Sequence, residues 1–231
     1  MKLEHVVGTL YRINLGMVNA YLVNEEELTL IDSGVPNSAD AIGEAVLQLG
    51  RRPDEIKRIV VTHLHVDHSG SVAEVKRRSG ATVYMHPLDA AEVLRGQGAR
   101  EMNPTPGVLS FLVTKLFMSH APSAVEAYET DATLEEGDTL DFAGDMRVLH
   151  LPGHAEGQIA LYSPSHGGVL IAADAAANMA GRLGFPIVVE DLAVAKESLR
   201  RLAEFDFEVA VFGHGRPILR GASEAFKARF R

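Results

Sequence analysis

The first 32 residues alternate between short apolar runs and polar turns, a pattern that predicts β-strands. The runs cover residues 6–13, 18–23 and 28–31, and the last run ends at Asp32-Ser33-Gly34. Two or three antiparallel strands are the simplest account of these runs. Apolar residues then recur at helical spacing, which predicts a helix that starts near Pro36, ends at Gly50 and contains Ala41, Ile42, Ala45, Val46 and Leu49.

The following stretch alternates strand and helix. The expected elements are a buried strand at 59–61, an amphipathic helix at 71–78, a strand at 81–85 and a short helix at 88–94. Within the first of these helices, Val72 and Val75 are expected to face inward. This alternation is typical of a sheet covered by helices, the α/β arrangement.

Residues 96–128 break the alternation. Glycine and proline mark a loop up to Gly107, and the helical pattern that follows has apolar residues on two sides, both of which must be covered. The cover could be a bound substrate, a partner subunit or the core beneath the helix. We expect this segment to be a lid or pocket wall inserted into the domain, with Phe111 and Met118 facing the substrate. A homodimer that buries the same surface is the open alternative.

The second half returns to short β-runs separated by dense turn signals. The runs cover residues 130–134, 139–142, 146–151, 159–163 and 169–173, and they predict antiparallel hairpins. A helix at 190–204, a buried strand at 209–212 and a terminal helix at 221–230 complete the pattern. Because each half has β-runs followed by helices, we expect a single domain, residues 1–231, built as a two-sheet sandwich with helices outside.

Composition and charge narrow the classes of protein. The 231 residues are 46% hydrophobic and 23% charged, as in an ordinary globular protein with room for one large domain. The formal net charge of -9 repels phosphate backbones and anionic lipids, so we expect neither a nucleic-acid nor a membrane partner. The sequence shows no signal-peptide pattern and no membrane-spanning run, so a cytoplasmic location is expected. It has no cysteine, so a metal would need nitrogen and oxygen ligands.

The strand at 59–61 leads into Thr62-His63-Leu64-His65-Val66-Asp67-His68, which concentrates three histidines and an aspartate at the end of a strand. Residues two apart point the same way in an extended segment, so His63 and His65 can share one metal ion. Asp67 and His68 follow where the chain turns into the helix, and they could serve a second ion. Imidazole and carboxylate donors suit zinc first, with iron, manganese, cobalt or nickel as alternatives.

Three further candidates also follow predicted strands. His154 comes after the run 146–151, Asp174 directly after 169–173, and His214 after 209–212. A carboxylate buried at Asp174 would need a cation or hydrogen-bond donors. The glycines on both sides of His214 allow a tight turn beside whatever that histidine binds.

As a set, these residues resemble the metal-binding series of the metallo-β-lactamase-fold hydrolases. The matching positions are His63, His65, Asp67, His68, His154, Asp174 and His214, together with Asp32 in Leu30-Ile31-Asp32-Ser33-Gly34 and the closing Gly213-His214-Gly215-x-Pro217. The resemblance covers nearly the whole chain and implies a four-layer αββα sandwich with the site at one edge between the sheets. It also implies one ion on His63, His65 and His154, a second ion on Asp67, His68 and His214, Asp174 as the bridge, and Asp32 as a carboxylate that orients the histidine-rich loop.

The implied chemistry is that of a dinuclear metal-dependent hydrolase. Two divalent ions, zinc expected first, would act on an ester, lactone or thioester bond of a small-molecule substrate through a metal-bridging hydroxide. Asp67 would in addition be catalytic, accepting a proton from the nucleophile and passing it on.

The substrate stays open because this fold serves many reactions. Ala177 stands where acyl-homoserine lactonases carry a tyrosine, and the 17 residues after His214 are too few for the glutathione-binding region of glyoxalase II enzymes. Two other functions also stay open. One is a mononuclear iron oxygenase resembling the persulfide dioxygenases, and the other is a metal-binding scaffold without turnover.

Overall fold

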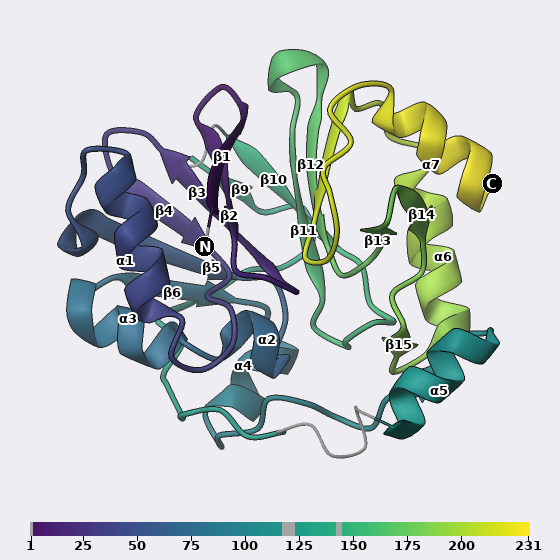
Figure 1. Cartoon of the computed structure of the whole chain (residues 1–231), viewed down its shortest axis with the longest axis horizontal. Helices are drawn as coiled ribbons and strands as arrows, with labels where there is room; N and C mark the ends of the chain where they lie inside the picture. The colour runs from purple at the N-terminus through teal and green to yellow at the C-terminus, as the bar shows by residue number, and fades with distance from the viewer. Residues whose placement is uncertain (1, 117–122, 142–144) are drawn as a thin grey trace.

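Two β-sheets packed face to face form the centre of the structure, a computed structural model that describes residues 2–116, 123–141 and 145–231 (Figure 1). The first sheet has the strand order β1-β2-β3-β4-β5-β6-β8, with β1 (Lys2–Val7), β2 (Leu10–Asn14), β3 (Asn19–Asn24), β4 (Leu28–Ile31), β5 (Ile56–Val61), β6 (Thr82–Met85) and β8 (Ala132–Thr133). The second sheet has the order β16-β12-β11-β10-β9, with β9 (Thr139–Leu140), β10 (Met146–His150), β11 (Ile159–Ser163), β12 (Val169–Ala173) and β16 (Val209–Phe212). Two short ladders lie outside these sheets, β13 (Ala177–Met179) with β14 (Arg182–Gly184) and β7 (Asn103–Pro104) with β15 (Val188–Val189).

Helices cover the outer face of each sheet. Figure 1 shows α1 (Ala39–Gln48) and α3 (Val72–Ser79) outside the first sheet, and α6 (Leu192–Leu202) and α7 (Ala222–Phe230) outside the second. Within the described parts of the chain, the remaining helical segments are α2 (Val66–Ser69), α4 (Pro87–Val93), α5 (Val108–Leu116), η1 (Pro53–Glu55) and η3 (Ser165–Gly167). The predicted αββα sandwich is therefore confirmed. Among the described residues, no helix is both long and apolar enough to cross a bilayer.

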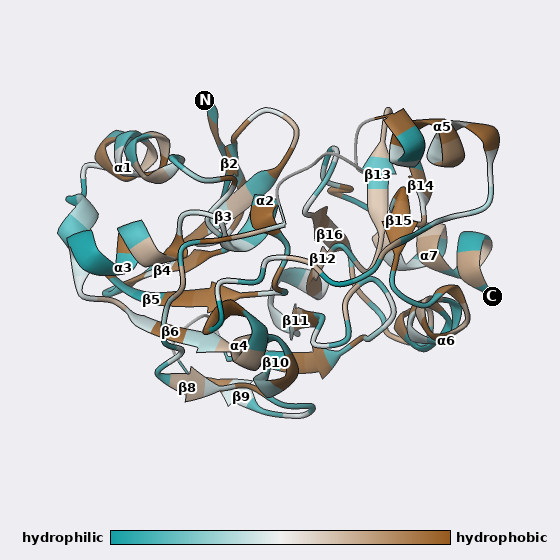
Figure 2. Ribbon diagram, turned by 90° about the horizontal axis from the view of Figure 1, so that it is seen from below, coloured by the Kyte–Doolittle hydropathy of each residue, from teal (hydrophilic) through white to brown (hydrophobic). Residues whose placement is uncertain are grey.

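Three apolar layers hold the four structural layers together. Ile31 and Val60 belong to the layer between the two sheets, while Leu30 and Ile59, their neighbours in sequence, pack toward α1 and α3. A third layer lies between the second sheet and the helices α6 and α7, and it includes Phe226. Where both faces of a strand are buried, as at residues 59–61 of β5 and throughout β12, its residues are apolar at consecutive positions. Figure 2 shows the second half of β5 in brown, whereas α1 and α6 carry both colours.

The amino-terminal strands differ from the prediction. Residues 1–32 form four strands rather than two or three, because the apolar run 6–13 is two strands, β1 and β2, that pair as an antiparallel hairpin. Gly8 adopts a positive φ of 54° at the turn between them. Glycine tolerates that conformation, so the chain reverses within the two residues Gly8 and Thr9, too short a break to divide the run by its pattern alone.

The predicted hairpins are partly confirmed. Strands β9 to β12 pair antiparallel in sequence order, as expected. The run 130–134 is the exception, because β8 pairs parallel with β6 and so extends the first sheet. The strands β7, β13, β14 and β15 were not predicted, since two or three residues are too few to show a period.

Parallel pairing brings the ends of four strands to the candidate site. In the first sheet β4 is parallel to β5, and in the second sheet β12 is parallel to β16. Hydrogen bonds from β3 of the first sheet join this edge to the end of β16 in the second sheet. The Tyr21 hydroxyl donates to the carbonyl of Phe212 at 2.6 Å, and the backbone amide of Asn19 donates to the carbonyl of Gly213 at 2.8 Å. Ligand sites form at such carboxyl-terminal edges because the loops that follow each strand converge there.

Candidate metal centre

The histidine-rich loop begins where β5 ends and leads directly into α2. His63 and His65 lie in the extended part before the helix, and Asp67 and His68 lie within it, as the spacing predicts. The side chains of His63 and His68 are fully buried, and that of His65 is nearly so. The loop therefore delivers its imidazoles to the interior rather than to solvent.

Asp32 holds this loop from the first sheet. Its Oδ1 accepts the Thr62 amide at 2.8 Å, and its Oδ2 accepts the Thr62 hydroxyl and Nδ1 of His68, each at 2.8 Å. Asp32 has a positive φ of 58°, a conformation that is uncommon outside glycine. Such strain persists only where the surroundings enforce it, and here the three hydrogen bonds do so.

The seven histidine and aspartate side chains expected at the centre come together in three overlapping groups. Within each group the donor atoms lie within 4.8 Å of one another, and the groups are His63, His65 and His154; His63, His68 and Asp174; and Asp67, His68 and His214. Asp174 lies between the others, with its oxygens 3.4 Å from Nε2 of His154, 3.2 Å from Nε2 of His214 and 3.6 Å from Nε2 of His68. The arrangement gathers candidate metal donors from both sheets around the carboxylate of Asp174.

Hydrogen bonds at the second ring nitrogen fix the orientation of several of these histidines. Nδ1 of His154 lies 2.9 Å from the carbonyl of Val188, and Nδ1 of His214 lies 2.7 Å from the carbonyl of Met17. Nδ1 of His63 lies 3.0 Å from the Thr62 hydroxyl. Bonds of this kind set the tautomer and ring plane of metal-binding histidines. In each case Nε2 is the nitrogen left to face the centre.

The centre contains donor atoms that need a partner. Among the described residues, Nε2 of His63, His65 and His68 and Oδ1 of Asp174 are buried without a hydrogen bond. Each such atom costs about 1–3 kcal/mol of folding free energy. A bound cation satisfies buried atoms of this kind, and nitrogen and oxygen donors without thiolate are a suitable set for a divalent ion. The residues present therefore fit a divalent metal.

Electrostatics divide the histidines into two kinds. Burial, together with the neighbouring imidazoles, holds the pKa of His63 and of His65 well below the usual value. Burial also opposes the charged form of His68, but the carboxylates of Asp174, Asp67 and Asp32 outweigh it and raise the pKa of His68 to about 10. A group of neutral imidazoles thus lies beside a group that attracts positive charge. Both features favour a cation bound between them.

The segments that carry Asp174 and His214 leave no spare room. Ala173 ends β12 with a positive φ of 46° at a shift of register, and this turns the chain directly before Asp174. A Cβ atom on Gly213 would collide with Oδ1 of Asp174 and press on His68. Glycine at position 213 is therefore required by the close approach of these two side chains.

Some sequence expectations lie elsewhere or go untested. Phe111 is 54% exposed on α5 and belongs to none of the three donor groups. Met118 lies outside the described residues, so its expected pocket role stays a prediction, as does that of Phe111. Conversely, the carbonyls of Met17 and Val188 orient two histidines, and no sequence pattern marks a backbone carbonyl for this role.

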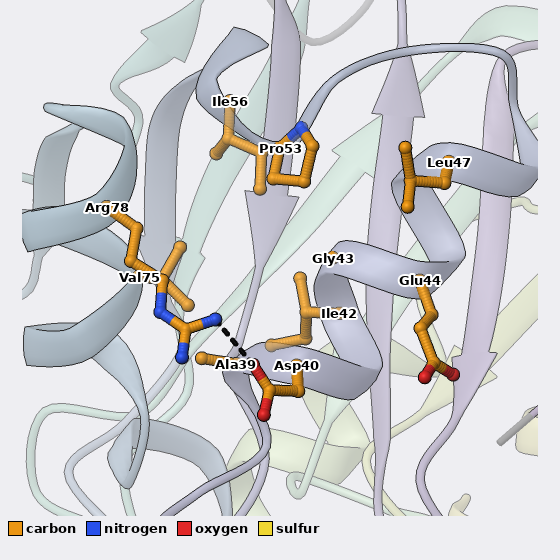
Figure 3. A pocket seen from close by; sticks show the side chains of 10 residues that line it. All are labelled: Ala39, Asp40, Ile42, Gly43, Glu44, Leu47, Pro53, Ile56, Val75 and Arg78. Atoms are coloured by element: carbon orange, nitrogen blue, oxygen red, sulfur yellow. Dashed lines mark hydrogen bonds and ion pairs between the residues drawn. The ribbon is translucent and has the colours of Figure 1, made fainter.

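A surface pocket of about 360 Å³ lies apart from this centre, between α1, η1 and α3. Ile42, Leu47 and Val75 are among its lining residues, and Arg78 pairs with Asp40 across it at 2.6 Å (Figure 3). None of the candidate donors lines this pocket. It is a gap between outer helices rather than part of the site.

The tight fit at Gly213 gives a first prediction. Gly213→Ala should displace Asp174 or His68 and lower the affinity for Zn²⁺ by about tenfold or more, as loss of a supporting contact does in metal sites. Competition with a chromophoric chelator measures this affinity. Gly184→Ala is the matched control, because a Cβ there meets nothing within 4 Å. Equal affinity in the two variants would contradict the geometry described for Gly213.

Comparison with known proteins places this geometry in a family. A model of the metallo-beta-lactamase superfamily matches residues 13–214. The probable metallo-hydrolase YflN of Bacillus subtilis is 26% identical over 224 residues, which cover 89% of this chain and 83% of the relative. The probable metallo-hydrolase YqjP of the same organism is 30% identical over 223 residues, which cover 88% of this chain and 69% of the relative.

Solved structures agree on the fold. BJP-1, a subclass B3 metallo-beta-lactamase of Bradyrhizobium japonicum, superimposes with a TM-score of 0.73 at 18% identity, covering 98% of this chain and 89% of that one. The family match, the αββα sandwich and the cluster of histidines and aspartates agree with one another. This chain belongs to the metallo-beta-lactamase superfamily.

Proposed function

We propose that this protein is a hydrolase that holds two divalent metal ions and cleaves an ester, lactone or thioester bond. The observation that carries the proposal is the set of four buried donor atoms without hydrogen-bond partners, on His63, His65, His68 and Asp174. Membership of a superfamily whose relatives include probable metallo-hydrolases supports a metal-dependent hydrolase in general. The number of ions, their identity and the substrate class are the further steps of the proposal.

Two of the three donor groups would each hold one ion. His63, His65 and His154 would hold the first, and Asp67, His68 and His214 the second, with Asp174 shared because its oxygens lie near histidines of both groups. Zinc suits this donor set best, and iron, manganese, cobalt and nickel accept the same donors. When bound, such a pair of ions lowers the pKa of a water molecule and polarises a carbonyl oxygen.

Asp67 is the donor best placed to move a proton as well. Its side chain is 38% exposed, whereas that of Asp174 is 3% exposed. Its Oδ2 lies 3.1 Å from Nε2 of His214, so one oxygen faces the centre while the side chain still reaches solvent. Asp67 would accept the proton of the attacking water and pass it to the leaving group, which is the role of a general base and then a general acid.

Two relatives with shorter overlap support an acyl substrate. A hydroxyacylglutathione hydrolase of Anaeromyxobacter dehalogenans is 35% identical over 136 residues, 54% of this chain, and the acyl-coenzyme A thioesterase MBLAC2 of Gallus gallus is 32% identical over 121 residues, 46% of this chain. Both names describe enzymes that cleave thioesters. For this chain, a thioester therefore ranks beside esters and lactones as the bond to test.

A panel of aryl esters, lactones and thioesters tests the reaction. Asp67→Asn should lower kcat/KM by about 10²- to 10⁴-fold, the usual contribution of a positioned general base. His65→Ala should lower both the bound metal and the activity, because it removes one donor. Asp54→Asn, an exposed carboxylate paired with Arg52 on η1, is the matched control and should keep full activity.

Either of two results would contradict the hydrolase. One is a panel that the wild-type protein does not hydrolyse, with one iron per chain and oxygen consumption from a thiol persulfide, which would support the mononuclear iron oxygenase. The other is a metal-loaded protein without turnover of any kind, which would support the scaffold.

The helix α5 is our candidate for the wall that receives the acyl group. Val108, Phe111 and Leu116 are 78%, 54% and 63% exposed on it, and Figure 2 shows α5 largely in brown. The helix follows β7, which pairs with β15, and the carbonyl of Val188 in β15 accepts from His154. This chain of contacts connects the apolar helix to a candidate metal ligand.

Phe111→Glu tests this wall. The variant should raise KM for long-chain acyl substrates, because a charge replaces apolar contact area, while kcat for short-chain substrates changes little. Leu47→Glu on α1, 60% exposed and also apolar, is the matched control and should change neither. A fall from dimer to monomer in size-exclusion chromatography, with turnover unchanged, would instead assign α5 to a subunit interface.

A further inference from the structure

Asp89 of α4 is a fully buried carboxylate outside the three donor groups. Its Oδ2 accepts the backbone amide of Leu64 at 3.0 Å, and its Oδ1 accepts the amide of Gly157 at 3.1 Å. Oδ1 also accepts Nη1 of Arg100 at 2.7 Å. A buried carboxylate is retained only when such donors replace its lost hydration. Here three donors from three different segments do so.

The two backbone donors belong to separate loops of the candidate metal centre. Leu64 lies between His63 and His65, and Gly157 lies three residues after His154. One carboxylate therefore ties together the loops that carry all three histidines of the first donor group. The approach is close, since a Cβ atom on Gly157 would meet the Asp89 carboxyl group at 2.5 Å.

Arg100 extends this connection to a third segment. Its Nη1 also lies 3.3 Å from Oε1 of Glu190, and its Nη2 donates to the carbonyl of Leu88 at 2.7 Å. The Glu190 amide in turn donates to the carbonyl of His154 at 3.2 Å. The His154 loop is thus held twice, once through Gly157 and once through Glu190.

Asp89 mirrors the arrangement at Asp32. Asp32 accepts the amide of Thr62, and Asp89 accepts the amide of Leu64, so buried carboxylates grip the histidine-rich loop at two positions two residues apart. The two carboxylates have different second partners. Asp32 also accepts from His68, and Asp89 also accepts from Gly157 in the His154 loop. The two carboxylates thus support different halves of the centre.

We infer that Asp89, assisted by Arg100, is a positioning residue that fixes His63, His65 and His154 relative to one another. The inference rests on the proposed metal centre. In this role Asp89 contacts neither the metal nor the substrate. Asp89 acts through the backbone amides of Leu64 and Gly157. Ligand geometry held in this way sets both the affinity for a metal and its coordination.

Asp89→Asn is the sharpest variant, because it keeps the size of the side chain and changes only its hydrogen-bonding character. All three partners of the carboxylate are donors, so an amide must turn its own N–H groups toward the donor of Leu64, Gly157 or Arg100. An NH2 group in place of Oδ2 loses the contact with Leu64, and an NH2 group in place of Oδ1 loses the contacts with Gly157 and Arg100, so at least one loop is released. Asp131→Asn is the matched control, since Asp131 also accepts a backbone amide, from Val83, and pairs with Lys76, away from the donor groups.

Metal-free protein is loaded with Co²⁺, and its visible absorption spectrum reports the number and geometry of the ligands. Competition with a chelator measures the affinity for Co²⁺. Asp89→Asn should lower the affinity by about 10- to 100-fold and shift the absorption bands. Asp131→Asn should match the wild type in both. Wild-type affinity and spectrum in Asp89→Asn, with a lower Tm alone, would reduce Asp89 to a structural role and overturn the inference.

A second variant covers the case in which Asp89→Asn does not fold. Arg100→Met keeps both backbone contacts of Asp89 and removes the link to Glu190, so it should produce a smaller loss of affinity with a band shift. Wild-type behaviour of Arg100→Met would overturn the inference in that case. A wild-type protein that binds no Co²⁺ would overturn the proposed function, and the inference with it, whereas normal binding in all variants overturns the inference alone.

Discussion

Burial of donor atoms without hydrogen-bond partners is the constraint on which the rest of this structure depends. Three imidazole nitrogens and one carboxylate oxygen lie in the interior in this state. At about 1–3 kcal/mol each, they cost a large share of the net stability of an ordinary domain. The fold must therefore supply that stability elsewhere, and the bound cation of the proposed function would recover part of it.

The αββα sandwich supplies this stability and also places the donor side chains at one edge of the sheets. Three apolar layers fix the sheets and the outer helices, and parallel pairs in each sheet bring strand ends to one edge. At that edge, Asp32 and Ala173 adopt positive φ values, which are strained for residues other than glycine. These turns orient the side chains of Asp32 and Asp174. Rigid strands thus set the position of the centre, and short loops set its fine geometry.

Much of this could be predicted from the sequence. The apolar runs predict the central strands because much of both faces of these strands is buried. The histidine-rich motif predicts the metal centre because histidines and aspartate are rare in that spacing. The turn at Gly8 was missed, and β8 was predicted as a strand but with the wrong partner. The chain reverses at Gly8 and Thr9, too short a break to show in a mainly apolar run, and the pairing of β8 depends on a partner strand far away in sequence.

The support of the centre was harder to predict than its donors. Asp32 is followed by Ser and Gly in a recognisable motif, but Asp89 is a lone aspartate inside a short helix, and its role depends on the amides of Leu64 and Gly157. Backbone amides and carbonyls carry no signature of their own in a sequence. Such contacts become visible only when the loops are placed in space.

The central claim is that two divalent ions occupy one buried cluster. Elemental analysis of protein purified without added metal, beside calorimetric titration of metal-free protein with Zn²⁺, tests it most directly. The account predicts about two ions per chain, one on His63, His65 and His154 and one on Asp67, His68 and His214, with Asp174 near histidines of both sets. A single tightly bound ion, or none, would contradict it.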